Sequence, residues 1–164
     1  MPQQLPVNFE PITISLNGQK QTLDPQAYLR VDRSNLSEEL ANHAEYYAYW
    51  GYIGAQVNFN LEALKLECDI LKADIDMQIR KAAANNAKKV TEAQIGALID
   101  KEPAYIELYK TYLESKRISE YVRSVVIAMY SKFKTLEELA KNERGENAIV
   151  AHPGVMSPIN NTQK

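Results

Sequence analysis

The sequence is poor in the residues that catalysis and metal binding usually need. It has one cysteine, Cys68, and two histidines, His43 and His152. A single cysteine excludes an internal disulfide framework, and the chain has no CxxC, HExxH, GxGxxG, P-loop or GxSxG motif. We therefore expect no catalytic residues, no metal site and no cofactor, and a protein that is not an enzyme.

Long apolar runs are absent too. The longest, "VVIAMY", falls far short of the roughly 18 apolar residues of a membrane span. The N-terminus, "MPQQLPVNFEP", has neither the basic nor the apolar region of a signal peptide. We expect no membrane association and a reducing, cytoplasmic location, which is the host cytoplasm if the protein is viral.

Proline is missing between Asp32 and Pro103, where apolar residues recur at alternating steps of four and three. This stripe consists of Leu36, Leu40, His43, Tyr47, Trp50, Gly54, Val57, Leu61, Leu64, Cys68, Leu71 and Ile75. It predicts a helix over about residues 35–84, which at about 1.5 Å per residue is roughly 70 Å long. Such a helix is too long for a compact globule of this size, so we expect an extended hairpin or an oligomerisation element.

A turn and a second long helix are predicted next. Asn85 and Asn86 favour a helix end, and the segment Thr91–Gln94 matches a capping box that opens a short helix with Ile95, Leu98 and Ile99 buried. Pro103 suits the first position of the last helix, which we expect to end near residue 141. Its apolar face is predicted to carry Tyr105, Leu108, Tyr112, Ser115, Ser119, Val122, Val126, Met129, Phe133 and Leu136.

The predicted fold is therefore mainly α, a long helical hairpin in which two long helices are joined by a turn and a short helix. Residues 1–33 are predicted to form an N-terminal arm, with a small β-hairpin around the Asn17-Gly18 turn signal. Residues 34–141 form the helical domain, and residues 142–164, which lack a helical period, are expected to be a flexible tail.

The long stripes predict that the chain assembles into a homo-oligomer, because one neighbouring helix covers too little apolar surface to stabilise a monomer. The residues expected at the interface are Tyr47, Trp50, Leu61, Leu64, Val122, Val126, Met129 and Phe133. The segment "EYYAYWGY" around Trp50 is open to two interpretations: its rings serve base stacking or a partner surface, or they pack between helices or subunits. Acids in the preceding residues favour packing, because carboxylates repel phosphates.

Charge is unevenly distributed along a chain whose net charge is −2. Residues 72–134 carry twelve lysines and arginines against eight acids, whereas residues 1–71 carry four against nine. The cations that flank the predicted turn and those on the last helix are candidates for phosphate contact, and they are Arg80, Lys81, Lys88, Lys89, Lys116, Arg117 and Arg123. The alternative is a merely solvated helical surface. Lys88 and Lys89 argue against it, because they precede a helix N-terminus, where the dipole disfavours cations.

These features together resemble a known family. A long helix opens with Tyr47 and Trp50 in a Tyr-x-x-Trp pair and continues through "LEALKLECDILKADID" to a basic turn. A second long helix then returns and ends in an apolar and basic segment. This order resembles the UvsY family, the recombination mediator proteins of T-even-type phages, over about residues 36–140. Members are small helical proteins that bind single-stranded DNA and form ring oligomers. They help to load a RecA-like recombinase onto DNA coated by the phage single-strand binding protein.

The resemblance implies a function for this chain. It implies a non-enzymatic mediator in DNA recombination and repair that binds single-stranded DNA, a RecA-like recombinase and a single-strand binding protein. The family's basic stretch falls on residues 72–76, so Lys72 joins the candidate DNA contacts, while Asp74 stands where the family has a basic residue. The alternative is an oligomeric helical structural or adaptor protein with no nucleic-acid role.

Overall fold

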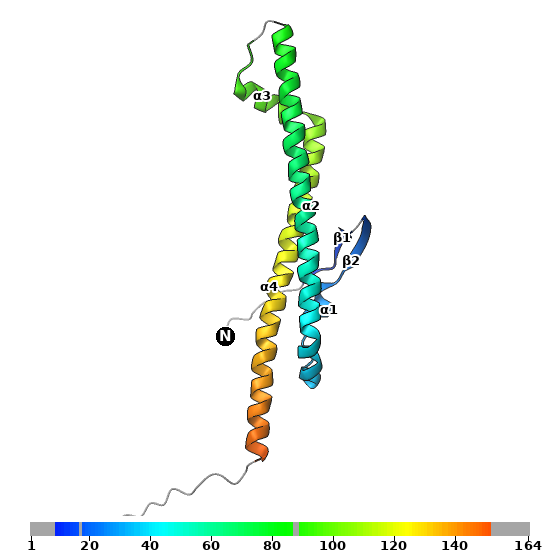
Figure 1. The fold of residues 1–164 in the computed structure, drawn as a ribbon, viewed down its shortest axis with the longest axis vertical. Helices are drawn as coiled ribbons and strands as arrows, with labels where there is room; N and C mark the ends of the chain where they lie inside the picture. The colour runs from blue at the N-terminus through cyan, green and yellow to red at the C-terminus, as the bar shows by residue number, and fades with distance from the viewer. Residues whose placement is uncertain (1–8, 17, 87–88, 152–164) are drawn as a thin grey trace, which may run out of the picture.

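Two long helices form the body of the molecule (Figure 1). The computed structural model describes residues 9–16, 18–86 and 89–151, with side chains in the last segment as far as residue 145. Helix α2 spans Leu36–Asn85 and α4 spans Pro103–Ala151, and they lie side by side in opposite directions. The short helix α3, Glu92–Ile99, lies where the chain turns back. The predicted helical hairpin is confirmed.

The N-terminal arm contains the predicted β-hairpin. Strands β1 (Ile12–Leu16) and β2 (Gln19–Leu23) pair antiparallel, and Gly18 takes a left-handed φ of 78° in the turn. The arm continues with two elements that the sequence pattern did not predict, helix α1 (Pro25–Leu29), capped by Asp24, and the 3₁₀ turn η1 (Arg33–Asn35). Asp24 caps α1 and Asp32 caps η1, each by accepting a hydrogen bond from a main-chain N–H two residues later. Elements this short show no hydrophobic period in the sequence.

The hairpin packs across the middle of the helix pair and completes the main hydrophobic core (Figure 1). Its buried side chains Ile12, Ile14, Leu16 and Leu23 meet those of α2 and α4. The residues of the helices with no exposed surface include Trp50, Ile53, Val122, Val125 and Met129. Ile53 and Val125 lie outside the predicted stripes, because each long helix buries a second flank under the arm as well as the face that meets the other helix.

Two details of the predicted helices are wrong. Leu98 of α3 is 50% exposed, whereas its neighbours Ile95 and Ile99 are buried. Helix α4 continues to Ala151, well past residue 141. Residues 142–147 of this extension include no apolar side chain, so the hydrophobic period stops before the helix does. Local contacts support the start of the extension: Lys141 pairs with Glu138, and Arg144 donates to the carbonyl of Ala140. Residues 152–164 of the predicted tail lie outside the described residues.

A buried lysine joins the arm to both long helices. Lys132 of α4, with a side chain 4% exposed, forms an ion pair with Glu39 of α2 at 2.6 Å. Its ammonium group also donates to the main-chain carbonyl of Tyr28 in α1, at 2.9 Å. One charged group therefore ties three elements together. Removing one partner of a buried pair leaves the other charge uncompensated.

We predict that Lys132→Met lowers the free energy of unfolding by about 3 kcal/mol, because Glu39 and the Tyr28 carbonyl lose their partner. Urea-induced unfolding followed by circular dichroism measures the change. Lys134→Met is the matched control, since the pair of Lys134 with Glu137 is exposed and its loss should leave the unfolding midpoint unchanged. Equal shifts for the two variants would show that the buried pair is not a structural tie.

Candidate nucleic-acid interface

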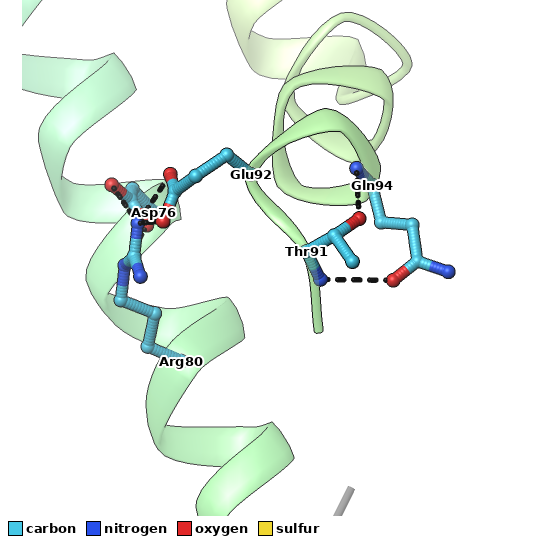
Figure 2. A network of polar contacts seen from close by, with 5 residues as sticks. All are labelled: Asp76, Arg80, Thr91, Glu92 and Gln94. Atoms are coloured by element: carbon cyan, nitrogen blue, oxygen red, sulfur yellow. Dashed lines mark hydrogen bonds and ion pairs between the residues drawn. The ribbon is translucent and has the colours of Figure 1, made fainter. Parts of the chain in front are cut away.

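The tip is the end of the helix pair where α2 ends, α3 packs and α4 begins (Figure 1). A small separate core holds it, in which Ile75 of α2 meets Ile95 and Ile99 of α3. The predicted capping box of α3 is confirmed: the Gln94 amide donates to Thr91 Oγ1, and the Thr91 amide donates to Gln94 Oε1 (Figure 2). The small core and the capping box therefore hold α3 in a defined place against α2.

The side chain of Arg80 forms ion pairs with two carboxylates at the tip (Figure 2). Its Nε donates to Asp76 at 2.6 Å, and its Nη2 pairs with Glu92 at 2.7 Å. The hydrogen bonds to Glu92 and Asp76 raise the pKa of Arg80 above its ordinary value. Because Asp76 belongs to α2 and Glu92 to α3, this predicted DNA contact instead joins the two helices. A phosphate would have to displace both carboxylates.

The lysines at the tip are arranged differently. Lys81 and Lys89 are exposed, and neither forms an ion pair with another described residue. Lys101, just after α3, is exposed as well. Lys88 lies outside the described residues. The tip therefore presents at least three lysines to solvent beside an arginine whose charge is balanced.

The remaining predicted contacts are spread along the helices. Lys72, Lys116 and Arg123 lack an ion pair among the described residues, whereas Arg117 pairs with Glu114 at 2.7 Å. That pair raises the pKa of Arg117 and lowers the pKa of Glu114. Arg123 follows the start of α4 by twenty residues, about 30 Å along a helix. The fold therefore does not gather the candidates into one patch.

Three of the eight predicted oligomer-interface residues are buried inside the chain. Trp50, Val122 and Met129 have no exposed surface, because α2, α4 and the arm bury them within one molecule. They have no surface left for a second copy in this fold. The other candidates keep some: Tyr47 is 41% exposed, and Leu61, Leu64, Val126 and Phe133 are partly buried.

A different apolar stripe on α2 faces solvent, and it was not recognised in the sequence. It consists of Tyr52, Phe59, Leu66, Ile70 and Met77, which are between 48% and 70% exposed. Their steps of seven, seven, four and seven place them at two positions of a heptad repeat, with Ala63 and Ala73 filling the intervening positions. We call this set the outer stripe. It was hidden in the sequence because it interleaves with the longer stripe that packs on α4.

Other kinds of site find little support in the described part of the chain. Burial raises the pKa of the Cys68 thiol, which disfavours the reactive thiolate. Within the described residues, no group of three or more histidine, cysteine or acidic side chains is placed to hold a metal ion. No helix there combines the length and apolarity that crossing a membrane requires.

Comparison with known proteins gives one informative match. No protein-family model matches the sequence, and no curated protein does. The crystal structure of the recombination mediator protein UvsY of bacteriophage T4 matches the fold with a TM-score of 0.61. The match covers 74% of this chain and 92% of the phage chain at 12% sequence identity. At that identity the similarity establishes a shared fold and leaves the binding residues open.

We predict that Arg80→Gln speeds amide hydrogen exchange in α3 about two- to fivefold at low salt, because α3 loses its ion-paired link to α2. Hydrogen exchange followed by mass spectrometry over residues 92–99 measures the effect. Lys81→Gln removes a cation of the same tip and should leave the exchange unchanged. An effect of the same size in both variants would contradict the assigned role of Arg80.

Proposed function

We propose that the chain is a non-enzymatic recombination mediator. It binds single-stranded DNA and helps to load a RecA-like recombinase onto DNA coated by a single-strand binding protein, in phage recombination and repair. The observation that carries this proposal is the fold shared with the T4 recombination mediator across 92% of that chain. In this role the protein works in the cytoplasm and needs no cofactor, because it arranges other macromolecules and transforms no substrate.

The tip is the proposed contact for the strand. Lys81 and Lys89 are exposed cations without a carboxylate partner among the described residues, and Lys88 directly precedes Lys89 in the sequence. One copy would hold phosphates weakly, since each contact is small and screened by salt. A ring of copies repeats the tip and multiplies the contacts. Lys72, Lys116 and Arg123 are secondary candidates, because they lie away from the tip.

The outer stripe is the proposed seam between copies in the ring. Its five large side chains follow the 3.5-residue period that one helix presents to another. Leaving them in water costs about 25 cal/mol for each Å² of apolar surface. An oligomer removes that cost without disturbing the core around Trp50. This assignment moves the interface away from the residues that the chain buries internally.

An oligomeric structural or adaptor protein without a nucleic-acid role is the second candidate. It is favoured by the pairing of Arg80 and Arg117 with carboxylates, which removes two cations from the proposed strand contacts. This alternative requires the same outer-stripe oligomer but predicts no affinity for strands. The two candidates therefore differ in strand binding alone.

We predict that the double variant Lys81→Gln with Lys89→Gln binds labelled single-stranded DNA more weakly than the parent chain. The slope of log affinity against log salt should fall by about 0.7 for each phosphate that the variant no longer neutralises. Fluorescence anisotropy from about 20 mM salt upward measures both, since the phosphate contribution is largest at low salt. Lys20→Gln, an exposed lysine of β2, should change neither quantity. If the parent chain shows no binding at the lowest salt, the mediator proposal fails and the adaptor stands.

We predict that Leu66→Glu combined with Ile70→Glu lowers the mass in solution to that of one chain, because charges in the seam cannot be solvated there. Sedimentation velocity at micromolar concentration measures the mass, and circular dichroism checks the helix content. Lys65→Glu also adds negative charge to α2, but beside the stripe, and should keep the oligomer. A parent chain that is already monomeric would disprove the seam.

A further inference from the structure

Leu98 is an apolar side chain that the small core of the tip leaves out. It is 50% exposed, whereas Ile95 and Ile99 of the same helix are buried against α2. The attachment of α3 therefore does not depend on this leucine. A single exposed leucine is common on protein surfaces and has no meaning by itself. The side chains that surround Leu98 are what give it a possible role.

A groove lies along the outer face of α3, and Leu98 is part of its floor. The groove has a volume of about 430 Å³, within the range of known ligand sites. We call it the α3 groove. Its lining consists of Lys89, Val90, Gln94, Ala97, Leu98 and Lys101. The last four follow the spacing of one helix face, and the face is the one turned away from the buried pair Ile95 and Ile99.

Both ends of the α3 groove carry a lysine. Lys89 precedes α3 and Lys101 follows it, and both are exposed and form no ion pair with another described residue. Among the described acids, none lines the groove: Glu92 is paired with Arg80, and Asp100 lines a separate pocket. The groove is therefore positive at its two ends and aliphatic between them.

The uncharged polar side chain of the α3 groove also offers a donor. Gln94 Oε1 already accepts the main-chain amide of Thr91 at 3.0 Å in the capping box, which leaves the Gln94 side-chain nitrogen. The Gln94 side chain extends from α3 on the side away from α2 (Figure 2). The polar side-chain atoms available in the groove are therefore all donors, so a ligand has to bring acceptors to them.

We propose that the α3 groove binds an acidic peptide segment of a partner protein, in which an aliphatic side chain stands between two carboxylates. The carboxylates pair with Lys89 and Lys101, and the aliphatic side chain covers Leu98. Helix α3 has 8 residues and is about 12 Å long. Four steps of an extended peptide cover about 13 Å, and side chains two positions apart point the same way. A segment of the form acid-x-leucine-x-acid therefore fits the groove.

The lining disfavours other anionic occupants. Bases of a single strand stack on aromatic rings or guanidinium planes, and the lining of the α3 groove contains neither. A fatty acid has one carboxylate at one end, whereas the lysines stand at both ends of the groove. Residues 1–8 and 152–164 of this chain contain no aspartate or glutamate, so they do not supply the acidic side chains.

This inference goes beyond the proposed function and stands without it, because peptide binding requires no strand. The two proposals share Lys89, so an acidic partner bound in the α3 groove would compete with a strand for that lysine. Leu98 belongs to the groove alone. A substitution at Leu98 therefore separates peptide binding from strand binding.

The experiment uses the full chain and a fluorescein-labelled peptide, Gly-Asp-Ser-Leu-Ser-Asp-Gly, followed by fluorescence anisotropy at about 20 mM salt, where screening is weak. We expect a Kd on the order of 100 µM, as for a short flexible ligand. Serine in place of the leucine should weaken binding at least fivefold, because the apolar contact is lost. Asparagine in place of both aspartates should weaken it at least as much. Equal binding of the leucine and serine peptides, or no binding of either, would overturn the proposal.

Two matched variants locate the site. Leu98→Asn should weaken the leucine peptide about fivefold, whereas Leu113→Asn, at a leucine of α4 that is 46% exposed, should leave its binding unchanged. Circular dichroism checks that both variants keep their helix content, and labelled single-stranded DNA should bind the two equally. If Leu98→Asn weakens DNA and not the peptide, the groove belongs to a strand and the proposal fails. If Leu98→Asn lowers the mass of the parent oligomer, the occupant is a second copy and the partner proposal fails as well.

Discussion

The burial of Trp50 is the contact on which the rest of the molecule depends. Two helices that meet along one face cover only part of each other, and their length adds exposed surface as fast as it adds contact. At Trp50 the arm supplies a third layer: Tyr28 packs edge-on against the indole at 5.9 Å, and the strands cover the adjoining residues. Lys132 secures the same region with a charge. The arm is therefore part of the core and not an appendage.

From this region the two helices extend in both directions, and the proposed strand contact and seam lie on surfaces that the arm leaves uncovered. The tip projects beyond the arm, held by its own small core. The outer stripe runs along the solvent side of α2. An elongated molecule can in this way place strand contact at one end of α2 and self-association along its side.

Local signals were the part of the fold that the sequence could predict. The capping box at Thr91, the helix start at Pro103 and the turn at Gly18 depend on neighbours within a few residues, so their positions were correct. Ile53, Val125 and Lys132 were missed because their burial depends on the arm, which is distant in sequence. For the same reason, a stripe that includes Trp50 could not reveal whether its partner was the same chain or another copy.

The candidate site was predicted less well than the fold, because a set of cations in a sequence does not say which are already paired. Asp76 and Glu92 balance Arg80, and they come from two different helices. These pairs are exposed, so dissolved ions weaken them as they weaken contacts to phosphate. Added salt therefore has two effects at the tip: it weakens the proposed binding of the strand, and it weakens the ion pairs that attach α3 to α2. The number of bound phosphates inferred from salt dependence would then include a contribution from the protein's own rearrangement.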